Sequence, residues 1–563
     1  MSHTSTLPED ASHAEIVAAL TNRWPEHRVA PSLGRIAALT ELLGDPQRAY
    51  AVIHVTGTNG KGSTAAMIEA LLRANGLRTG RFSSPHVTSV TERIAVNGEP
   101  LSERRFDDVF REIAPYIDLV DAQQIDGVDM TFFEIITAMA YAAFADAPVD
   151  VAVIEVGLGG TWDATNVADG DVAVVTPIDL DHTHLLGSTV AEIATEKAGI
   201  IKPGALAVLA GQSADAAHVL LERSAEVGAL VQREGIEFGV LDRVPAVGGQ
   251  LLRLMSAEGS VDEIFLPLYG AHQAANAAQA LAAAEAFLGM KALNPDVVRE
   301  GFASVTMPGR MEVVRRSPTV VLDAAHNPHG ARAAAATITE AFAFTPLVGV
   351  LAAMGDKDVR GMLEIWAEVM QQVVVTQVAS TSRGMPADEL GELAAGVFGA
   401  ERVTVAPRLD DAIETAVTLA EADDMGGSGV LVTGSVVLVG EARTLLVKQQ
   451  AADDAAADQT PADLDDDWTE EPSDDDPESD GSESDGLEAA EPAEVGLVGP
   501  DLVDADLTGV AVVGESFTAD GDEDDPFADE DPFADDPVDQ GRYDEWDADN
   551  GGPGPGVGEQ DGR

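Results

Sequence analysis

The stretch Val52-Ile-His-Val-Thr-Gly-Thr-Asn-Gly-Lys-Gly-Ser63 decides the fold, because an apolar run leads directly into a turn with three glycines and one lysine. A helix-favouring run from Thr64 to Ala74 follows at once. In such a strand–turn–helix unit, glycines let backbone N–H groups approach phosphate oxygens, and the helix N-terminus adds its positive end. We therefore expect Lys61 to reach the outer phosphates of a nucleotide and Ser63 to lie close to a bound metal.

The spacing of this loop differs from the common phosphate-binding pattern G-x-x-x-x-G-K-[ST]. Counting back from Lys61, position 55 is Val rather than Gly, and position 62 is Gly rather than Ser or Thr. The alternative is a glycine-rich turn that binds nothing. The strand before the loop and the helix after it are the context that the motif requires, so phosphate binding is favoured.

Length and charge set broad limits on the protein. The 563 residues are enough for two or three domains, and 45% hydrophobic residues with a mean hydropathy of +0.02 suit a globular chain. The net charge of −65 is uneven, because residues 451–563 hold about 40 acidic residues and two arginines, which leaves about −27 for the rest. Phosphate contacts need clustered Lys and Arg, so we expect no nucleic-acid partner.

The composition also bears on compartment and chemistry. The absence of cysteine from the sequence excludes disulfides, thiolate catalysis and cysteine-ligated metals. The first ten residues lack the basic start and apolar run of a signal peptide, and no apolar stretch approaches the roughly 20 residues of a membrane span. We expect a cytoplasmic, monomeric protein with no membrane partner.

Apolar runs alternate with helical patterns along the first half of the chain. Residues 14–21 and 34–43 form amphipathic pieces, and Val149–Val156, Val172–Thr176 and Ala205–Ala210 have the short, β-branched composition of buried strands. This alternation predicts an α/β fold with a mostly parallel sheet flanked by helices. Ligands bind at the carboxyl ends of the strands in such sheets, so residues that follow each strand are candidates for function.

A second alternating set begins after a change of character near residue 306. Before it come a polar, glycine-rich, hairpin-like region over about 230–265 and an alanine-rich helix over 271–288. The strands predicted after it are Thr319–Leu322, Leu347–Leu351, Gln372–Thr376, Arg402–Val405 and Gly429–Val432. We predict a first domain over 1–305 and a second over 306–450.

Residues 451–563 lose all periodicity and consist mainly of Asp, Glu, Ala, Gly and Pro. They cannot bury enough apolar area to offset the entropy of ordering, so a disordered tail is predicted. Either it only improves solubility, or its spaced aromatics and its repeat bind a partner that the sequence does not identify. The repeat is Asp525-Pro-Phe-Ala-Asp529 followed by Asp531-Pro-Phe-Ala-Asp535.

Three side chains that could bind a metal ion through oxygen or imidazole nitrogen lie at or after successive strands. They are Ser84, Glu155 and His182. A hydroxyl, one carboxylate and one imidazole, completed by phosphate oxygens, suit Mg²⁺, which takes few protein ligands. Three histidines or a His-Glu-x-x-His helix would have indicated zinc, and neither occurs nearby. Each residue alone could be structural, as a cap, a core histidine or a turn residue. Their joint placement beside a phosphate loop favours a metal site.

Seven motifs in order extend this pattern. They are Gly57-Thr-Asn-Gly-Lys-Gly-Ser63, Ser83-Ser-Pro-His86, Glu155-Val-Gly-Leu-Gly-Gly160, Asp181-His-Thr-His-Leu-Leu-Gly187, Lys197-Ala-Gly-Ile-Ile-Lys202, Pro308-Gly-Arg-Met-Glu312 and Asp323-Ala-Ala-His-Asn-Pro328. Through them the chain resembles, over about residues 15–445, the folylpolyglutamate synthase/dihydrofolate synthase family of the Mur ligase superfamily. The resemblance implies a P-loop Mur-ligase-type ATP-binding domain, a smaller Rossmann-like glutamate-ligase domain, and a role in folate biosynthesis and one-carbon metabolism. The acidic tail lies outside it.

The resemblance also implies roles around the ATP phosphates. It makes Ser84, Glu155 and His182 magnesium ligands, and it makes Lys197 a carbamylated lysine beside a second Mg²⁺. Unmodified, Lys197 would repel both ions, so the carbamate has an electrostatic reason. The residues that would hold the phosphates are Thr58, Asn59, Gly60, Lys61, Gly62 and Ser63.

Further along the chain, the resemblance places Asn276 beside adenine, Arg310 and Asp323 on the nucleotide, and His326 near the same site. An arginine at the junction of two domains would meet developing phosphate charge only when the domains close. Lys61, Lys197, His182 and Arg310 are therefore the candidate catalytic residues.

Two stretches match the part of the family site that holds the pterin-bearing substrate. Adjacent residues on a helix point about 100° apart, so at most one of Phe132 and Phe133 should face the ligand. The chain departs from the family in having Asp323-Ala-Ala, and it lacks an aromatic residue after Ser435, which leaves the contacts there open. The two stretches contain Thr131, Phe132, Phe133 and Glu134, and Trp162, Asp163 and Ala164.

The reaction implied is ATP-dependent addition of L-glutamate to dihydropteroate, to the glutamate tail of reduced folates, or to both, through an acyl phosphate. Such catalysis consists mostly of positioning and charge stabilisation, so no nucleophile is expected. One alternative is another Mur-type amino-acid ligase acting on a UDP-muramoyl peptide, but only about 56 residues precede Gly57, too few for the extra UDP-binding domain. The other is a nucleotide-dependent switch with an acidic effector tail, which would give Glu155, His182 and Lys197 no role.

Overall fold

The computed structural model describes residues 7–8, 10–23, 30–422 and 427–457. The described residues all belong to one compact unit, so the boundary near residue 306 stays a prediction. The predicted disordered tail lies outside the described residues, except at its start. There the last helix, α15 (Val436–Ala457), continues about seven residues into the stretch predicted to be disordered.

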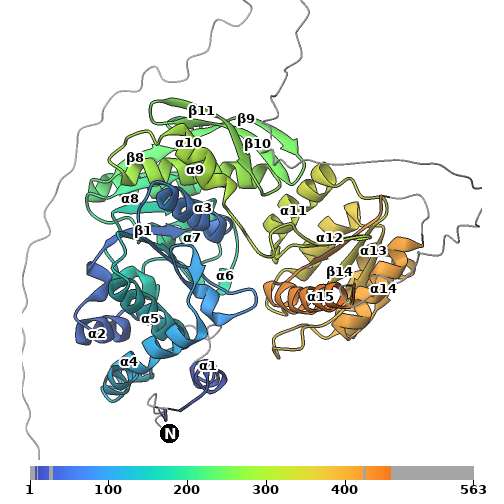
Figure 1. The fold of residues 1–563 in the computed structure, drawn as a ribbon, viewed down its shortest axis with the longest axis horizontal. Helices are drawn as coiled ribbons and strands as arrows, with labels where there is room; N and C mark the ends of the chain where they lie inside the picture. The colour runs from blue at the N-terminus through green and yellow to red at the C-terminus, as the bar shows by residue number, and fades with distance from the viewer. Residues whose placement is uncertain (1–6, 9, 24–29, 423–426, 458–563) are drawn as a thin grey trace, which may run out of the picture. The chain divides into compact units, whose positions relative to one another are not determined.

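An eight-stranded sheet, of which Figure 1 labels β1 and β8, organises the first half of the chain. Its strand order is β4-β3-β2-β5-β1-β6-β7-β8. The strand before the phosphate loop, β1, lies inside it and pairs in parallel with β5 and β6. Only β3, next to one edge, runs opposite to the other strands, and it pairs antiparallel with both β2 and β4. The strands are β1 (Ala51–Thr56), β2 (Thr79–Phe82), β3 (Ile94–Val96), β4 (Glu99–Pro100), β5 (Val151–Glu155), β6 (Val172–Val175), β7 (Leu206–Leu209) and β8 (Leu230–Arg233).

Both faces of this sheet are covered by helices, which explains why its parallel strands are almost continuously apolar. Alternate residues of β1 point to opposite cores: Ile53 and Val55 pack toward α3, α9 and α10, whereas Val52 packs toward α1, α2, α4 and α5. A third cluster joins β6 and β7 to α6, α7 and α8. These helices are α1 (His13–Thr21), α2 (Gly34–Leu42), α3 (Lys61–Ala74), α4 (Glu103–Asp121), α5 (Phe132–Asp146), α6 (Thr183–Leu186), α7 (Val190–Ala198), α8 (Ala214–Val227), α9 (Ala271–Phe287) and α10 (Pro295–Ala303).

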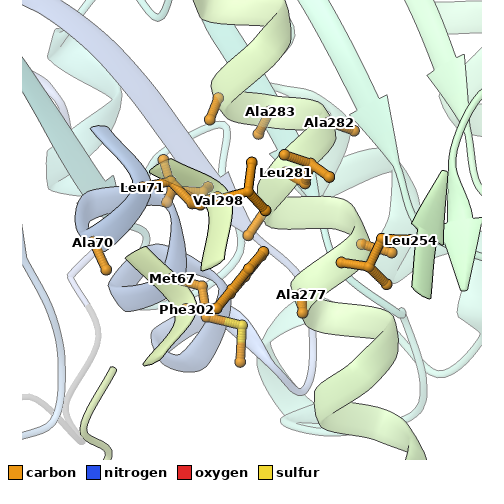
Figure 2. Packing of buried hydrophobic residues seen from close by; sticks show 14 of the residues in the cluster. Met67, Ala70, Leu71, Leu254, Ala277, Leu281, Ala282, Ala283, Val298 and Phe302 are labelled. Atoms are coloured by element: carbon orange, nitrogen blue, oxygen red, sulfur yellow. The ribbon is translucent and has the colours of Figure 1, made fainter. Parts of the chain in front are cut away.

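The helix after the phosphate loop, α3, is fixed by close packing against α9 and α10 (Figure 2). Nearly all of α9 is buried, and most of its residues are alanine, so neighbouring backbones can approach it closely. Larger side chains fill the remaining space, and they are Met67, Leu71, Leu254, Leu281, Val298 and Phe302. The phosphate loop and the polar residues of α9 therefore belong to one rigid core.

The region 230–265 differs in part from the single hairpin-like unit expected from the sequence. Leu230–Arg233 forms β8, which pairs in parallel with β7 after the crossover helix α8. A three-stranded antiparallel sheet follows, consisting of β9 (Gly239–Ala246), β10 (Gly249–Ser256) and β11 (Gly259–Leu266). β8 belongs to the larger sheet because the βαβ crossover through α8 places it at the edge beside β7.

The second alternating set forms a six-stranded sheet with the order β12-β13-β17-β14-β15-β16. Its alternate residues again face two cores, with α11, α12 and α13 on one side and α14 and α15 on the other. All five predicted strands are present within one residue of their predicted ends. The elements are β12 (Glu312–Arg316), β13 (Thr319–Leu322), β14 (Leu347–Leu351), β15 (Gln372–Val375), β16 (Val403–Val405), β17 (Gly429–Thr433), α11 (Pro328–Ala341), α12 (Val359–Val369), α13 (Ala387–Phe398) and α14 (Leu409–Glu421). The predicted α/β class with mostly parallel sheets is confirmed.

Candidate active site

A cavity of about 680 Å³ lies at the carboxyl ends of the central strands. It is lined by every candidate site residue that the sequence analysis named except Phe132. These lining residues are Thr58, Asn59, Gly60, Lys61, Gly62, Ser63, Ser84, Thr131, Phe133, Glu134, Glu155, Trp162, Asp163, Ala164, His182, Lys197, Asn276, Arg310, Asp323 and His326. The fold therefore brings together groups from segments more than 250 residues apart in the sequence.

The phosphate loop has the conformation that an anion cradle requires. Gly60 is the N-cap of α3 with a φ of +89°, and because glycine has no side chain it makes no side-chain cap to the first N–H groups of the helix. A Cβ on Gly60 would lie 2.7 Å from Asn276 Oδ1, and one on Gly57 would lie 1.8 Å from Thr176 Oγ1. Lys61 Nζ donates to the carbonyl oxygens of Gly57, at 3.1 Å, and Thr58, at 3.3 Å. Free helix N–H groups and a lysine thus converge on one point.

A buried carboxylate lies beside this loop. The Glu155 side chain is about 4% exposed, and its Oε2 accepts the Ser84 backbone N–H at 3.2 Å. A Cβ on Gly62 would lie 3.4 Å from the same oxygen, so the carboxylate adjoins the turn. Burial raises the pKa of Glu155 and lowers that of Lys61, and each charge opposes the shift of the other. A carboxylate buried here is suited to a bound cation.

Asp181 and His182 meet a lysine that the sequence analysis did not single out. Lys357 Nζ lies 2.7 Å from Asp181 Oδ1 and 3.3 Å from His182 Nε2. Burial acts to raise the pKa of Asp181, but the Lys357 ammonium holds it well below its usual range. Burial and Lys357 lower the pKa of His182 to about 4, so its imidazole is neutral at physiological pH. The signal for Lys357 was its position in the loop after the predicted strand at 347–351.

The donors Ser84, Glu155 and His182 fit a magnesium ion. A hydroxyl, a buried carboxylate next to the phosphate loop and a neutral imidazole leave most of the coordination shell to water and phosphate oxygens, as Mg²⁺ prefers. Among the residues that the structure describes, no group of three or more His, Asp or Glu side chains forms a metal cluster by itself. Bound nucleotide oxygens would therefore have to complete the site.

Lys197 lies below the phosphate loop and is about 3% exposed. Its Nζ donates to the Gly57 carbonyl oxygen at 2.8 Å. Burial lowers the pKa of Lys197 to about 7, and the positive charge of Lys61 adds to this shift. A substantial fraction of the Lys197 amine is consequently uncharged at neutral pH, which is the reactive form of an amine.

The nucleotide-side residues come from α9, from the loop before β12 and from the loop after β13. Gln273 links α9 to the phosphate loop by donating to Ser63 Oγ at 3.3 Å. Within α9, Gln273 also accepts from Asn276 at 3.1 Å. Asp323 is buried and accepts the backbone N–H groups of Met311 and Ala325. Its carboxylate is thus held in place, and burial raises its pKa.

Hydrogen bonds also join the phosphate loop region to the loop after β13. Asn59 contacts His329 Nδ1 at 2.9 Å and accepts from Asn327 at 3.2 Å. Asn327 also donates to Asp181 at 3.1 Å. The sequence analysis gave neither Asn327 nor His329 an individual role, although Asn327 belongs to the motif that contains Asp323 and His329 directly follows that motif.

The other end of the cavity is framed by the start of α5. Thr131 caps this helix in a reciprocal arrangement with Glu134, whose carboxylate also accepts from buried Arg35 at 3.0 Å. Phe133 lines the cavity, and its ring fills the space beside Gly157. Phe132 instead packs in the core with the Arg93 guanidinium 5.1 Å from its ring centre. Phe133 but not Phe132 therefore lines the cavity, because the two side chains leave the helix in different directions, and a substrate contact of either residue stays a prediction.

This end of the cavity is also lined by Trp162, Asp163 and Ala164. The buried Asp163 carboxylate, however, already accepts hydrogen bonds from the protein itself. It accepts the Leu158 N–H at 2.9 Å and both the N–H and the hydroxyl of Thr165. Asp163 therefore shapes the glycine-rich loop at 157–160, and burial raises its pKa.

Comparison with protein families identifies the class of enzyme that this fold and cavity define. The Mur ligase middle domain matches residues 55–284, and the glutamate ligase domain of Mur ligases matches residues 309–436. The chain is thus a Mur-type ligase. It belongs to the dihydrofolate synthase/folylpolyglutamate synthase family, as the resemblance of its motifs predicted. The dihydrofolate synthase/folylpolyglutamate synthase of Mycobacterium tuberculosis is 50% identical over 463 residues, covering 78% of this chain and 95% of that protein. The Escherichia coli enzyme of the same description is 36% identical over 364 residues, covering 64% and 80%.

Solved structures agree with this assignment. The M. tuberculosis folylpolyglutamate synthase complexed with ADP shares 49% identity and a TM-score of 0.75, over 78% of this chain and 99% of that one. E. coli FolC in complex with DHPP and ADP shares 31% identity and a TM-score of 0.68, over 79% and 100%. The predicted ligase class is confirmed, and the alternative of a non-enzymatic switch is not supported. Among the described residues, no helix combines the length and the apolar character of a membrane span.

Proposed function

We propose that this enzyme uses ATP to join the amine of L-glutamate to a carboxylate of dihydropteroate, of reduced folates, or of both. The observation that supports this most directly is the single cavity, which connects a phosphate loop, a magnesium-type donor set and an aromatic end at Phe133 and Trp162. A pterin ring is flat and largely apolar on its faces, so aromatic side chains suit it. The two similar structures with bound ADP support ATP as the nucleotide.

The chemistry follows from the positions of the charged groups. A carboxylate oxygen of the acceptor attacks the γ-phosphorus of ATP, and the bond from this phosphorus to the bridging β-phosphate oxygen breaks. The products of this step are ADP and an acyl phosphate on the acceptor. Lys61 and the Arg310 guanidinium stabilise the negative charge that develops on the phosphoryl oxygens. Magnesium held by Ser84, Glu155 and His182 would supply further positive charge there. The neutral amine of L-glutamate then attacks the acyl carbon, phosphate leaves, and the nitrogen loses a proton.

We assign Lys197 as a carbamylated residue. Its uncharged amine would attack CO₂, forming an N–C bond and releasing one proton, and the product carries a negative charge in place of a positive one. An unmodified Lys197 would add a second positive charge beside that of Lys61 and repel metal cations. The negative carbamate removes this repulsion and attracts cations to the loop, including a second Mg²⁺. The burial of Lys197 and its lowered pKa both support the reaction.

We also infer that residues 1–305 and 306–450 act as two domains and that the enzyme works as a cytoplasmic monomer. The bonds from Asn327 and Lys357 to Asp181 join these two parts, and Arg310 follows directly after their junction. Closure of the two parts would bring Arg310 to the phosphates at the moment of reaction.

The decisive assay measures ADP formation by the full chain with MgATP, L-glutamate and either dihydropteroate or a monoglutamyl reduced folate. We expect ADP to form only when glutamate and an acceptor are both present, with one glutamate added per ADP. Lys61→Met should lower kcat about 10²- to 10³-fold, since it removes one preorganised positive charge from the transition state. Lys291→Met, at an exposed lysine beyond α9, is the control and should leave kcat unchanged. ADP formation without glutamate would contradict the proposal.

A further inference from the structure

The loop between β2 and β3 is held in shape by one carboxylate, that of Glu92. This carboxylate accepts the backbone N–H groups of three residues of the same loop, which are Val87 at 2.8 Å, Thr88 at 3.1 Å and Ser89 at 2.9 Å. Hydrogen bonds to an ionised acceptor are about twice as strong as those between neutral groups. The half-buried Val87 is therefore held firmly to the rest of its loop.

Val87 packs between two glycines of the other half of the molecule. Its side chain contacts the apolar cluster of the six-stranded sheet, although its own loop belongs to the eight-stranded sheet. A Cβ on Gly440 of α15 would lie 1.9 Å from the Val87 carbonyl oxygen. A Cβ on Gly309 would lie 3.8 Å from Val87 Cγ1 and 2.7 Å from Val439 Cγ1. We call Gly309, Val439 and Gly440 the Val87 socket.

The socket is itself tied together by hydrogen bonds. Glu312 Oε2 accepts the Gly309 N–H at 2.8 Å, and the same carboxylate accepts from Arg443 Nε of α15 at 3.0 and 3.1 Å. The Gly309 carbonyl oxygen accepts the Ala324 N–H at 2.9 Å. The turn before β12 and the helix α15 therefore form one unit, into which Val87 fits.

This contact lies next to two groups on which the proposed chemistry depends. Ser84, a donor for Mg²⁺, lies three residues before Val87, and Arg310 directly follows Gly309. Ser84 and Arg310 both line the cavity, whereas Val87 is not part of its lining. Because these two groups come from different sheets, their separation depends on a contact between the two halves. The Val87 socket adjoins both groups in the sequence.

We propose that Val87 is a positioning residue, which fixes Ser84 relative to Arg310 and so sets where a bound magnesium ion meets the transferring phosphate. Val87 acts only through the groups on either side of it, and the inference rests on the proposed function. When catalysis depends on positioning, a displacement of about 1 Å lowers the rate about 100-fold. Loss of a group that orients a metal ligand lowers metal affinity by about 10- to 100-fold.

The test fills the socket with Gly440→Ala. The added Cβ would force the Val87 carbonyl oxygen to move by about 1.5 Å, to the 3.4 Å of ordinary contact. In the full chain, kcat for glutamate-dependent ADP formation should therefore fall about 100-fold. In calorimetric titrations, the affinity for ADP with Mg²⁺ should fall about tenfold, and the affinity for ADP with EDTA should stay at the wild-type value. A residue that only stabilised the fold would not separate these two affinities.

Gly396→Ala is the matched control. Gly396 also lies inside a helix, α13, but a Cβ there would meet nothing within 4 Å. Glycine-to-alanine replacement has the same effect on helix propensity at both positions, so this variant should keep kcat and both ADP affinities.

A second pair of variants tests the socket if Gly440→Ala does not fold. Val87→Ala leaves the socket partly empty and should lower kcat about tenfold, together with the affinity for ADP with Mg²⁺. Val87→Thr keeps the branched shape and should retain both.

Two results would overturn the inference. One is a folded Gly440→Ala or Val87→Ala enzyme with wild-type kcat and wild-type affinity for ADP with Mg²⁺. The other is an equal loss of ADP affinity with Mg²⁺ and with EDTA, which would mean a general defect of the nucleotide site. Both leave ligation by the wild-type enzyme intact. Failure of the proposed function is different, since the wild-type enzyme would then form no ADP in response to glutamate and an acceptor.

Discussion

Substitution of His54 tests how the buried polar residues beneath the active site affect stability. His54 lies in β1, is fully buried, and has Nε2 2.9 Å from Thr165 Oγ1. The Thr165 hydroxyl already donates to Asp163, so His54 Nε2 must be the donor, and Nδ1 has no hydrogen-bond partner among the described residues. Burial, helped by the positive charge of Lys202, lowers the pKa of His54 to about 3. The folded protein thus keeps this imidazole neutral.

The lowered pKa of His54 gives a definite dependence of stability on pH. In the unfolded chain a histidine binds a proton below about pH 6.5, whereas folded His54 does not until about pH 3. The unfolded state therefore binds more protons in this window, and stability falls as the pH falls, by about 1.4 kcal/mol per pH unit. Between pH 7.5 and pH 5.0 the loss from His54 alone is about 2 kcal/mol. For roughly 440 described residues this corresponds to about 2 °C in Tm.

The assay is thermal unfolding of wild type and His54→Gln at pH 7.5 and pH 5.0. Glutamine can still donate to Thr165 but does not titrate, so the drop in Tm between the two pH values should be about 2 °C smaller in the variant. His218→Gln, at an exposed histidine of α8, controls for simple loss of an imidazole. Equal drops in wild type and His54→Gln would refute the reasoning, since His54 would then titrate alike in both states.

Three further predictions concern the site and the tail. Gly60→Ala should weaken MgATP binding at least tenfold in a calorimetric titration, because its Cβ would lie 2.7 Å from Asn276 Oδ1. The control is Gly76→Ala, at a similar φ of +86° with nothing within 4 Å of the added Cβ. This control should keep normal affinity for MgATP and lose only about 1–2 kcal/mol of stability. Lys197→Ala should lose turnover that short added carboxylates partly restore, and a complete lack of rescue would count against the carbamate. Removal of residues 458–563 should leave kcat and KM within twofold, and a large loss would make the tail part of the enzyme.

Local composition was sufficient to predict much of the fold. The strand, glycine turn and helix around Lys61 form a continuous pattern, and the buried parallel strands are apolar runs because both sheet faces are covered. Glu155 ends a predicted strand and Ser84 and His182 follow predicted strands, and all three line one cavity. The first strand of the 230–265 region was misassigned, because the sequence of a short strand does not specify which sheet it joins.

The sequence by itself determined which chemical groups this protein has and in what order: a phosphate loop, oxygen and imidazole donors after strands, and two alternating α/β sets. Only the tertiary structure decided which of them meet. Lys357 pairs with Asp181 across 176 residues, and Phe133 rather than Phe132 lines the cavity. Such contacts depend on how elements pack, and hydrogen bonds between distant segments leave no periodic signal in the residues that form them.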